Sequence, residues 1–113
     1  MTTVAVLRGG VGAEHDVSLK TGLNVLRKLE RAPWRPVDVY IDRTGVWHVR
    51  GVPMMPARAL SGTDVVFNAL HGQYGEDGTV QRELDRLAVP YTGSNAYASS
   101  VAMNKLLTKQ VLQ

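Results

Sequence analysis

Short apolar runs alternate with amphipathic helical stretches along this chain, and this alternation constrains its fold more than any other feature. The β-branched run Thr3 to Leu7 ends abruptly at Gly9-Gly10, which is typical of a buried parallel strand entering a tight loop. Asp64 to Leu70 is a second such run, and it leads directly into His71-Gly72. Because parallel neighbours need a returning helix between them, the pattern predicts an α/β fold with an open, mostly parallel sheet and flanking helices.

The other elements are predicted from the same periodicities. We expect helices over Asp16 to Glu30, Thr79 to Leu87, Ala96 to Met103 and from Lys105 onward, with one helical turn at Ala57 to Leu60. The apolar stripe of the first helix is expected to consist of Leu19, Leu23 and Leu26, widened by Val25 and Leu29. Further strands are expected over Val37 to Ile41, Val46 to Val49 and Val89 to Thr92. Turn residues 42–45 should join the strands at 37–41 and 46–49 into a small hairpin. Apart from the single helical turn, residues 51–62 should form a surface loop.

Composition restricts the class of protein. With 113 residues, of which 44% are hydrophobic, the chain suits one compact core. The formal charge of +3 comes from scattered residues without a dense basic run, so nucleic-acid binding is not expected. The sequence has no cysteine, which excludes disulfides and thiolate metal sites. Its start resembles neither a signal peptide nor a membrane span, so we expect a cytoplasmic protein without a membrane partner.

Two glycine-containing loops follow the predicted strands at the edge where open α/β sheets collect ligands. The first, L-R-G-G-V-G-A-E-H-D-V-S-L, fails the dinucleotide fingerprint G-x-G-x-x-G, because His15 stands where the third glycine is required. Its Glu14 would repel pyrophosphate but would hold a substrate ammonium by a charge-assisted hydrogen bond. The second loop, H-G-Q-Y-G-E-D-G-T-V-Q, places His71 at the end of a buried strand. We therefore expect Glu14 and His71 to face one crevice that receives an amine-bearing ligand.

Simpler interpretations exist for the same residues. Glu14 could be a carboxylate that the helix dipole favours, and His71 could be a hydrogen-bonded histidine at a strand end. Ser18 lacks a strained elbow or a partnered base, so helix capping or loop bracing is favoured over nucleophilic catalysis. Adjacent residues at a helix start point in different directions, so no metal site is expected at residues 14–16. We expect His15 and His48 to lie at the surface. Glu76 and Asp77 are expected to stabilise the start of a helix. The aromatic residues expected to pack in the core are Trp34, Trp47 and Tyr91.

Taken together, the loops resemble those of the D-alanine:D-alanine ligases. The family signature H-G-x-x-G-E-D-G-x-hydrophobic-Q is matched at His71, Gly72, Gly75, Glu76, Asp77, Gly78, Val80 and Gln81. The first family loop is matched at Leu7, Gly9, Gly10, Glu14, Val17, Ser18, Leu19 and Gly22, and two later segments at residues 90–94 and 103–106 follow in the right order. The chain departs from the family at Gly12, where serine is usual, and at Arg82, where a small residue is usual.

The resemblance implies a Rossmann-like amino-terminal domain that binds substrate over residues 1–103, and the start of a central ATP-grasp domain at residues 104–113. It implies ATP-dependent joining of two D-alanines for peptidoglycan synthesis, in which the first carboxylate takes the γ-phosphoryl group and the second amine attacks the acyl phosphate. Magnesium or manganese ions would neutralise the phosphates.

Residue roles are implied in the same way. Glu14 would anchor the ammonium of the first D-alanine, and His71 would lie near the reacting carboxyl group. Ser18 and Gly72 would also contact substrate, and Lys105 would bind ATP phosphate. A homodimer through this domain is also implied.

The sequence leaves other possibilities open. The last segment is still helical in pattern where the sequence stops, so we expect a truncated chain. The resemblance implies that the magnesium ligands and most of the nucleotide cleft lie beyond it, so we expect no ligase turnover from this chain alone. A nucleotide-binding Rossmann-like module and a non-catalytic interaction domain are the alternative functions. The second substrate could be D-alanine, D-lactate or D-serine, because residues outside this chain largely select it.

Overall fold

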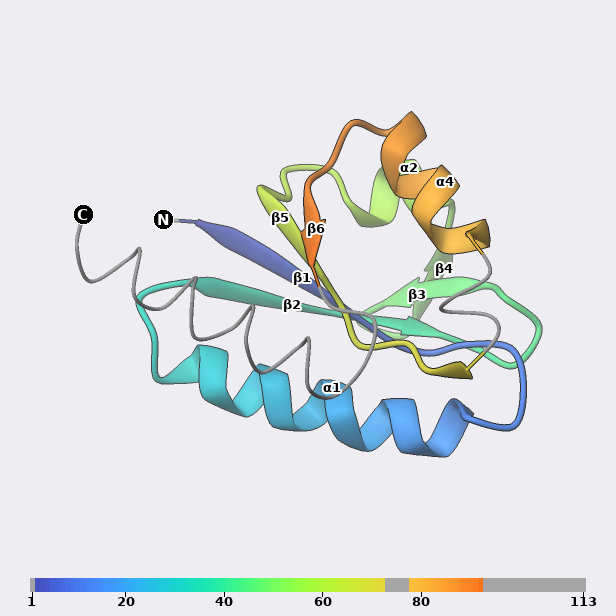
Figure 1. Ribbon diagram of the computed structural model, residues 1–113. Coiled ribbons are helices and arrows are strands. Elements are labelled where there is room, and N and C mark those ends of the chain that lie inside the picture. Colours follow the sequence, from blue (N-terminus) through green and yellow to red (C-terminus); the bar gives the residue numbers. More distant parts are fainter. Residues whose placement is uncertain (1, 73–77, 93–113) are drawn as a thin grey trace.

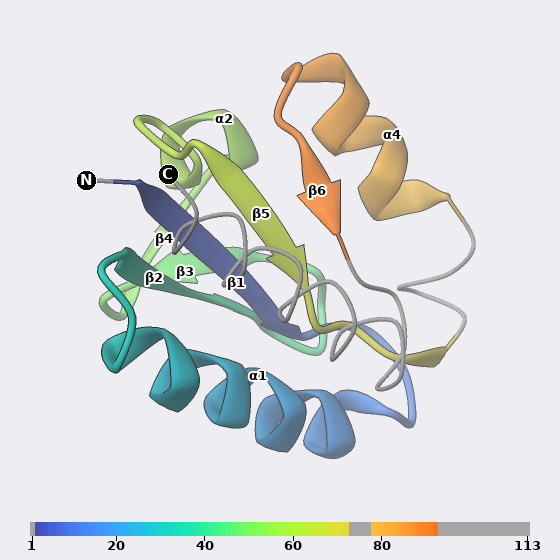
Figure 2. The same ribbon diagram turned by 60° about the vertical axis from the view of Figure 1, so that its left-hand side comes forward.

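The computed structural model describes residues 2–72 and 78–92, which form one sheet with helices on both faces (Figure 1 and Figure 2). The strands in these ranges are β1 (Thr3–Gly9), β2 (Arg35–Ile41), β3 (Trp47–Val49), β4 (Val52–Met54), β5 (Val65–Asn68) and β6 (Tyr91–Thr92). The helices in these ranges are α1 (His15–Glu30), α2 (Pro56–Ala59) and α4 (Thr79–Arg86). None of these helices is long and apolar enough to cross a membrane. The expected helices at 96–103 and from 105 onward lie outside the described residues.

The strand order across the sheet is β4-β3-β2-β1-β5-β6. The central strand β1 pairs in parallel with both β2 and β5, and β6 extends the parallel part beside β5. The β2–β3 and β3–β4 pairs are antiparallel. The predicted α/β fold, with an open, mostly parallel sheet and a hairpin, is confirmed.

Both faces of the sheet are buried, as the continuous apolar runs predicted. On one face Ala5 and Leu7 of β1 join a core cluster with residues of α2 and α4, including Val80 and Leu84. On the other face α1 covers the sheet (Figure 1), and Val4 and Val6 pack with Val25, Leu26, Leu29, Trp34 and Phe67. Trp34 and Trp47 are buried, as expected of packing aromatics. Alternate side chains of β1 therefore tie the two layers of helices to one strand.

The buried stripe of α1 differs from the expected one, because Leu23 is exposed. The helix instead packs through Ser18, Gly22, Val25, Leu26 and Leu29. A Cβ atom at Gly22 would lie 2.5 Å from Cβ of Arg8, so only glycine lets the helix approach β1 this closely. The prediction failed at Leu23 because it was made from the spacing of apolar side chains. Gly22 has no side chain to add to that spacing, although it is buried against Arg8 of β1.

Strand β4 was missed, because Pro53 led us to expect a surface loop over residues 51–62. Among the described strands, β4 is an edge of the sheet and pairs with β3 alone. An edge position tolerates a proline, which cannot donate a ladder hydrogen bond. The expected single turn of helix is present as α2.

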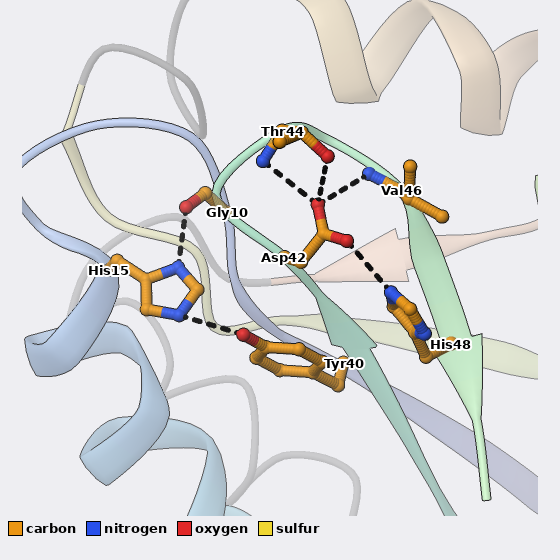
Figure 3. Close-up of polar contacts among 7 residues, drawn as sticks. All are labelled: Gly10, His15, Tyr40, Asp42, Thr44, Val46 and His48. Atoms are coloured by element: carbon orange, nitrogen blue, oxygen red, sulfur yellow. Dashed lines mark hydrogen bonds and ion pairs between the residues drawn. The ribbon is translucent and has the colours of Figure 1, made fainter. Parts of the chain in front are cut away.

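The turn between β2 and β3 is organised by Asp42. Its Oδ1 atom accepts hydrogen bonds from the backbone N–H of Thr44 (2.8 Å) and Val46 (3.0 Å) and from the Thr44 hydroxyl (2.6 Å). Its Oδ2 atom lies 2.9 Å from Nε2 of His48 (Figure 3). The hydrogen bonds from Thr44, His48 and Val46 lower the pKa of the Asp42 carboxyl, because each favours the charged form.

We predict that the stability provided by Asp42 depends on pH. A carboxyl whose pKa is lower in the folded than in the unfolded chain stabilises the fold above the unfolded value, and that contribution is lost as the pH falls from about 4 through the folded value. The Asp42→Asn variant should therefore melt below the wild type at pH 7, and the two melting temperatures should converge in acid. Thermal unfolding followed by circular dichroism checks this, with the exposed Asp16→Asn as control; a difference that is constant from pH 7 to pH 2 would contradict it.

Candidate functional site

The candidate site lies where β1, β2 and β5 end. These three strands run parallel, so their carboxyl ends meet at one edge of the sheet. The backbone N–H of Gly10 donates to the carbonyl of Ile41 at 2.8 Å, and that of Ala69 donates to the carbonyl of Leu7 at 3.0 Å. The first bond holds the loop after β1 against the end of β2, and the second holds the segment after β5 against β1.

One polar stripe of the first helical turns faces the segment after β5. Glu14, Ser18 and Thr21 are spaced so that they share one side of α1, and each contacts a different part of the 69–72 segment. Ser18 Oγ donates to the carbonyl of Ala69 at 2.8 Å, and Thr21 Oγ1 lies 2.8 Å from Nε2 of His71. The third member, Glu14, lies against Gly72. We call Glu14, Ser18 and Thr21 the polar stripe of α1.

Glu14 and Gly72 are in direct contact. A Cβ atom at Gly72 would lie 2.8 Å from Cγ of Glu14 and 3.3 Å from its Cβ, so the Glu14 side chain rests on the backbone of residue 72. Gly72 also has a φ of 75°, which other residues rarely adopt. Glu14 is exposed, stands at the N-cap position of α1 and makes no side-chain capping hydrogen bond. Its carboxylate is therefore not used to cap its own helix.

The His71 ring is oriented by Thr21, which the sequence did not single out. The Thr21 hydroxyl has one hydrogen and donates it to the carbonyl of Val17 at 3.1 Å. The Thr21 oxygen is then the acceptor in the contact with His71, and Nε2 of His71 carries the donated hydrogen. This contact fixes the ring of His71 against the same helix that presents Glu14.

Ser18 is fully buried and braces the two strand ends. Its Oγ accepts the backbone N–H of Gly9 at 2.9 Å and donates to the carbonyl of Ala69 at 2.8 Å. The prediction that Ser18 braces the loop is confirmed. Its assignment as a substrate contact stays a prediction.

The expectation that His15 lies at the surface was wrong, because its side chain is only 3% exposed. Its Nδ1 lies 2.6 Å from the carbonyl oxygen of Gly10 and its Nε2 3.2 Å from the hydroxyl of Tyr40, as Figure 3 shows. His48 was also expected at the surface, but it is partly buried and contacts Asp42. Both errors have one cause. Tyr40 of β2 lies between the two histidines and contacts both rings, and the spacing of residues in the sequence does not reveal these contacts.

Arg8 joins α1 to the sheet beneath the site. Its Nε and Nη2 atoms bind the two carboxylate oxygens of Asp38 at 2.8 and 2.6 Å, and its Nη1 donates to the carbonyl of Leu19 at 3.2 Å. Hydrogen bonding to Asp38 raises the pKa of the Arg8 guanidinium, although burial opposes this. Such a bidentate pair gives a fixed geometry, so Arg8 helps to set the distance between α1 and β2.

Part of the second loop and the predicted ATP contact lie outside the described residues, namely Gly75, Glu76, Asp77 and Lys105. Within residues 2–72 and 78–92, no group of three or more histidine, cysteine, aspartate or glutamate side chains is arranged to hold a metal ion.

Comparison with known proteins agrees with the fold described above. The profile of a family described as "D-ala D-ala ligase N-terminus" matches residues 3–58 and 49–94. The D-alanine--D-alanine ligase of Geobacter sulfurreducens is 43% identical over 110 residues, which cover 97% of this chain and 32% of that protein.

Solved structures agree as well. The D-alanine-D-alanine ligase of Coxiella burnetii superposes with a TM-score of 0.72 at 30% identity, covering 99% of this chain and 41% of that one. The Bacillus anthracis ligase complexed with ATP gives a TM-score of 0.61 at 32% identity, with 99% and 35% covered. The chain thus spans about a third of the length of the curated relatives it matches.

We predict that Gly72→Ala displaces the Glu14 side chain. The added Cβ would overlap Glu14 Cγ, whereas a Cβ at Gly62, which has a similar φ of 79°, would meet no atom within 4 Å. Gly62→Ala therefore serves as a control for backbone strain, and both variants should lose about 1–3 kcal/mol of unfolding free energy. Crystal structures should show Glu14 moved in Gly72→Ala alone; an unmoved Glu14 in that variant would refute the contact.

Proposed function

The chain belongs to the D-alanine–D-alanine ligase family as its amino-terminal part, and we propose that it binds the first D-alanine of an ATP-dependent ligase. The product would be D-alanyl-D-alanine for peptidoglycan synthesis in the cytoplasm. The proposal is carried by the exposed Glu14 side chain, which rests on Gly72 through Cβ and Cγ and whose carboxylate makes no capping hydrogen bond. It lies beside a histidine held by the same helix.

Glu14 would bind the ammonium group of the first D-alanine. An ammonium and a carboxylate form a charge-assisted hydrogen bond that is stronger than a neutral one. The contact with Gly72 limits where the carboxylate can point, so the substrate would be oriented as well as bound. Orientation of this kind contributes to catalysis without any proton transfer by Glu14.

His71 would lie near the carboxyl group of the same D-alanine. Its Nε2 hydrogen is directed to Thr21, so a contact with the substrate would be made by the other ring nitrogen. Charge that develops on the substrate carboxyl would be stabilised by a ring held in place before the reaction, rather than by proton abstraction. The buried brace at Ser18 would keep the Glu14 and His71 segments together.

ATP and a divalent metal, magnesium or manganese, would be bound mainly by parts of the protein outside the described residues. Lys105, which we propose contacts ATP phosphate at the start of an ATP-grasp domain from residue 104, lies in this part of the chain. When bound, ATP would supply the phosphoryl group that activates the substrate carboxylate. A homodimer formed through this domain belongs to the same proposal.

A nucleotide-binding module is the main alternative, and the loop geometry disfavours it. Phosphate binding at such a loop needs backbone N–H groups that point outward and are free. Here the N–H of Gly9 donates to Ser18 and that of Gly10 donates to Ile41, so both amides are used inside the protein. The neighbouring Glu14 carboxylate would further repel a phosphate.

We predict that Glu14→Gln impairs the full-length ligase. Loss of one charged hydrogen bond to the substrate ammonium should lower kcat/KM for D-alanine about 10- to 100-fold. Steady-state release of phosphate checks this, with Glu30→Gln at the other end of α1 as the matched control. Equal kcat/KM values in the two variants would contradict the role of Glu14.

We also predict that residues 1–113 alone do not join D-alanine. The segment corresponds to about a third of its curated relatives, and the residues proposed for ATP and metal lie mostly beyond it. ATP-dependent formation of D-alanyl-D-alanine by the isolated segment, detected by mass spectrometry, would refute this; the full-length protein is the positive control.

A further inference from the structure

We propose that His15 and Tyr40 are positioning residues that hold the loop carrying Glu14 in its binding conformation. The inference rests on the proposed binding of D-alanine by Glu14. It starts from two groups of polar contacts drawn in Figure 3, one that joins Gly10, His15 and Tyr40 and one that joins His48 to Asp42. A contact between the rings of Tyr40 and His48 links the two groups.

The first group of contacts fixes the loop after β1. Gly10 donates its N–H to Ile41 at 2.8 Å and accepts from His15 Nδ1 at 2.6 Å, so its peptide groups are held from two sides. A Cβ atom at Gly9 would lie 3.1 Å from His15 Cε1 and 3.3 Å from Tyr40 Cε1, so both rings also pack against the loop backbone. Glu14 is covalently next to His15, and therefore the direction of Glu14 depends on where this ring is anchored.

The contacts assign a protonation pattern to His15. A carbonyl oxygen only accepts hydrogen bonds, so Nδ1 of His15 must carry a hydrogen. In the neutral ring Nε2 is then an acceptor, and the Tyr40 hydroxyl donates to it across 3.2 Å. Tyr40 thus selects the ring form that can hold Gly10.

Ring contacts and the second group of contacts secure Tyr40. Its ring meets His15 edge to face, with centroids 5.6 Å apart and an interplanar angle of 85°, and it lies 5.6 Å from the ring of His48. His48 in turn contacts Asp42, which organises the β2–β3 turn. The hairpin therefore acts as a support for the loop after β1, although no hairpin residue reaches Glu14 in the contacts described.

The test is Tyr40→Phe in the full-length ligase, which removes one hydroxyl and keeps the ring. Without that donor the buried Nε2 of His15 loses its partner, and KM for the D-alanine that meets Glu14 should rise about tenfold while kcat changes little. Tyr91→Phe is the matched control, because Tyr91 is also a partly buried tyrosine but lies on β6, on the other side of β1 from β2. A purely structural role for Tyr40 would lower the melting temperature without moving KM.

Two replacements of His15 make the test stricter. Asparagine offers an amide N–H close to where Nδ1 lies, so His15→Asn should keep the bond to Gly10 and behave like Tyr40→Phe. Leucine offers no donor, so His15→Leu should raise KM further. Equal KM values for His15→Asn and His15→Leu, or a KM in Tyr40→Phe that matches that of Tyr91→Phe, would overturn the proposal.

A spectroscopic measurement separates this inference from the proposed function. Long-range ¹H–¹⁵N correlation of histidine-labelled protein, assigned with His15→Asn, should show His15 protonated at Nδ1 in the wild type. Protonation at Nε2 alone would overturn the inference even in an active ligase. An inactive full-length protein that still shows the Nδ1 form would instead contradict the proposed ligase function and leave the loop anchor established.

Discussion

The packing of the polar stripe of α1 against the segment after β5 is the interaction on which the candidate site depends. Ser18 lies at its centre and joins the last amide of β1 to the carbonyl of Ala69. Because a buried polar group left without a partner costs about 1–3 kcal/mol, this one hydroxyl strongly favours a single rotation of the helix. In that rotation Glu14 contacts Gly72 and Thr21 contacts His71. A helix rotated by one residue about its axis would lose these two contacts and that of Ser18.

The same packing decides which charge the site can accept. At the carboxyl edge of an α/β sheet, free backbone amides and a helix amino terminus commonly bind anions. Here the amides of Gly9 and Gly10 are used inside the protein, while the amino-terminal end of α1 favours a carboxylate at Glu14. The structural and functional interpretations of Glu14 are therefore compatible: the helix dipole stabilises the carboxylate, and its lack of a capping hydrogen bond leaves it available to a cation.

The sequence allowed α1, the hairpin and every described strand except β4 to be predicted, because each depends on local periodicity or on residues close together in the chain. It did not reveal Thr21, Arg8 or Tyr40 as supports. Thr21 contacts a residue 50 positions away, and Arg8 and Tyr40 act across 30 and 25 positions. Pairs this distant become visible only when the register of β1 against β2 and β5 is known. The burial of His15 was mispredicted for that reason, since its exposure depends on Tyr40 rather than on its neighbours in sequence.

Among the described residues, the site combines a hydrogen-bonded frame with the exposed Glu14 carboxylate, which does not cap its own helix, and this division has an energetic reason. The frame consists mainly of hydrogen bonds at Ser18, His15 and Thr21, each of which adds only about 0.5–1.5 kcal/mol of net stability. Their larger effect is to order the backbone before a ligand arrives, so that binding does not have to order it.

Glu14 is the exception, because its carboxylate gains no hydrogen bond from its own helix. Contact with Gly72 restricts the side chain of Glu14, so less side-chain entropy remains to be lost when an ammonium group binds. Affinity for an amine would then depend as much on the backbone beneath Glu14 as on the carboxylate itself.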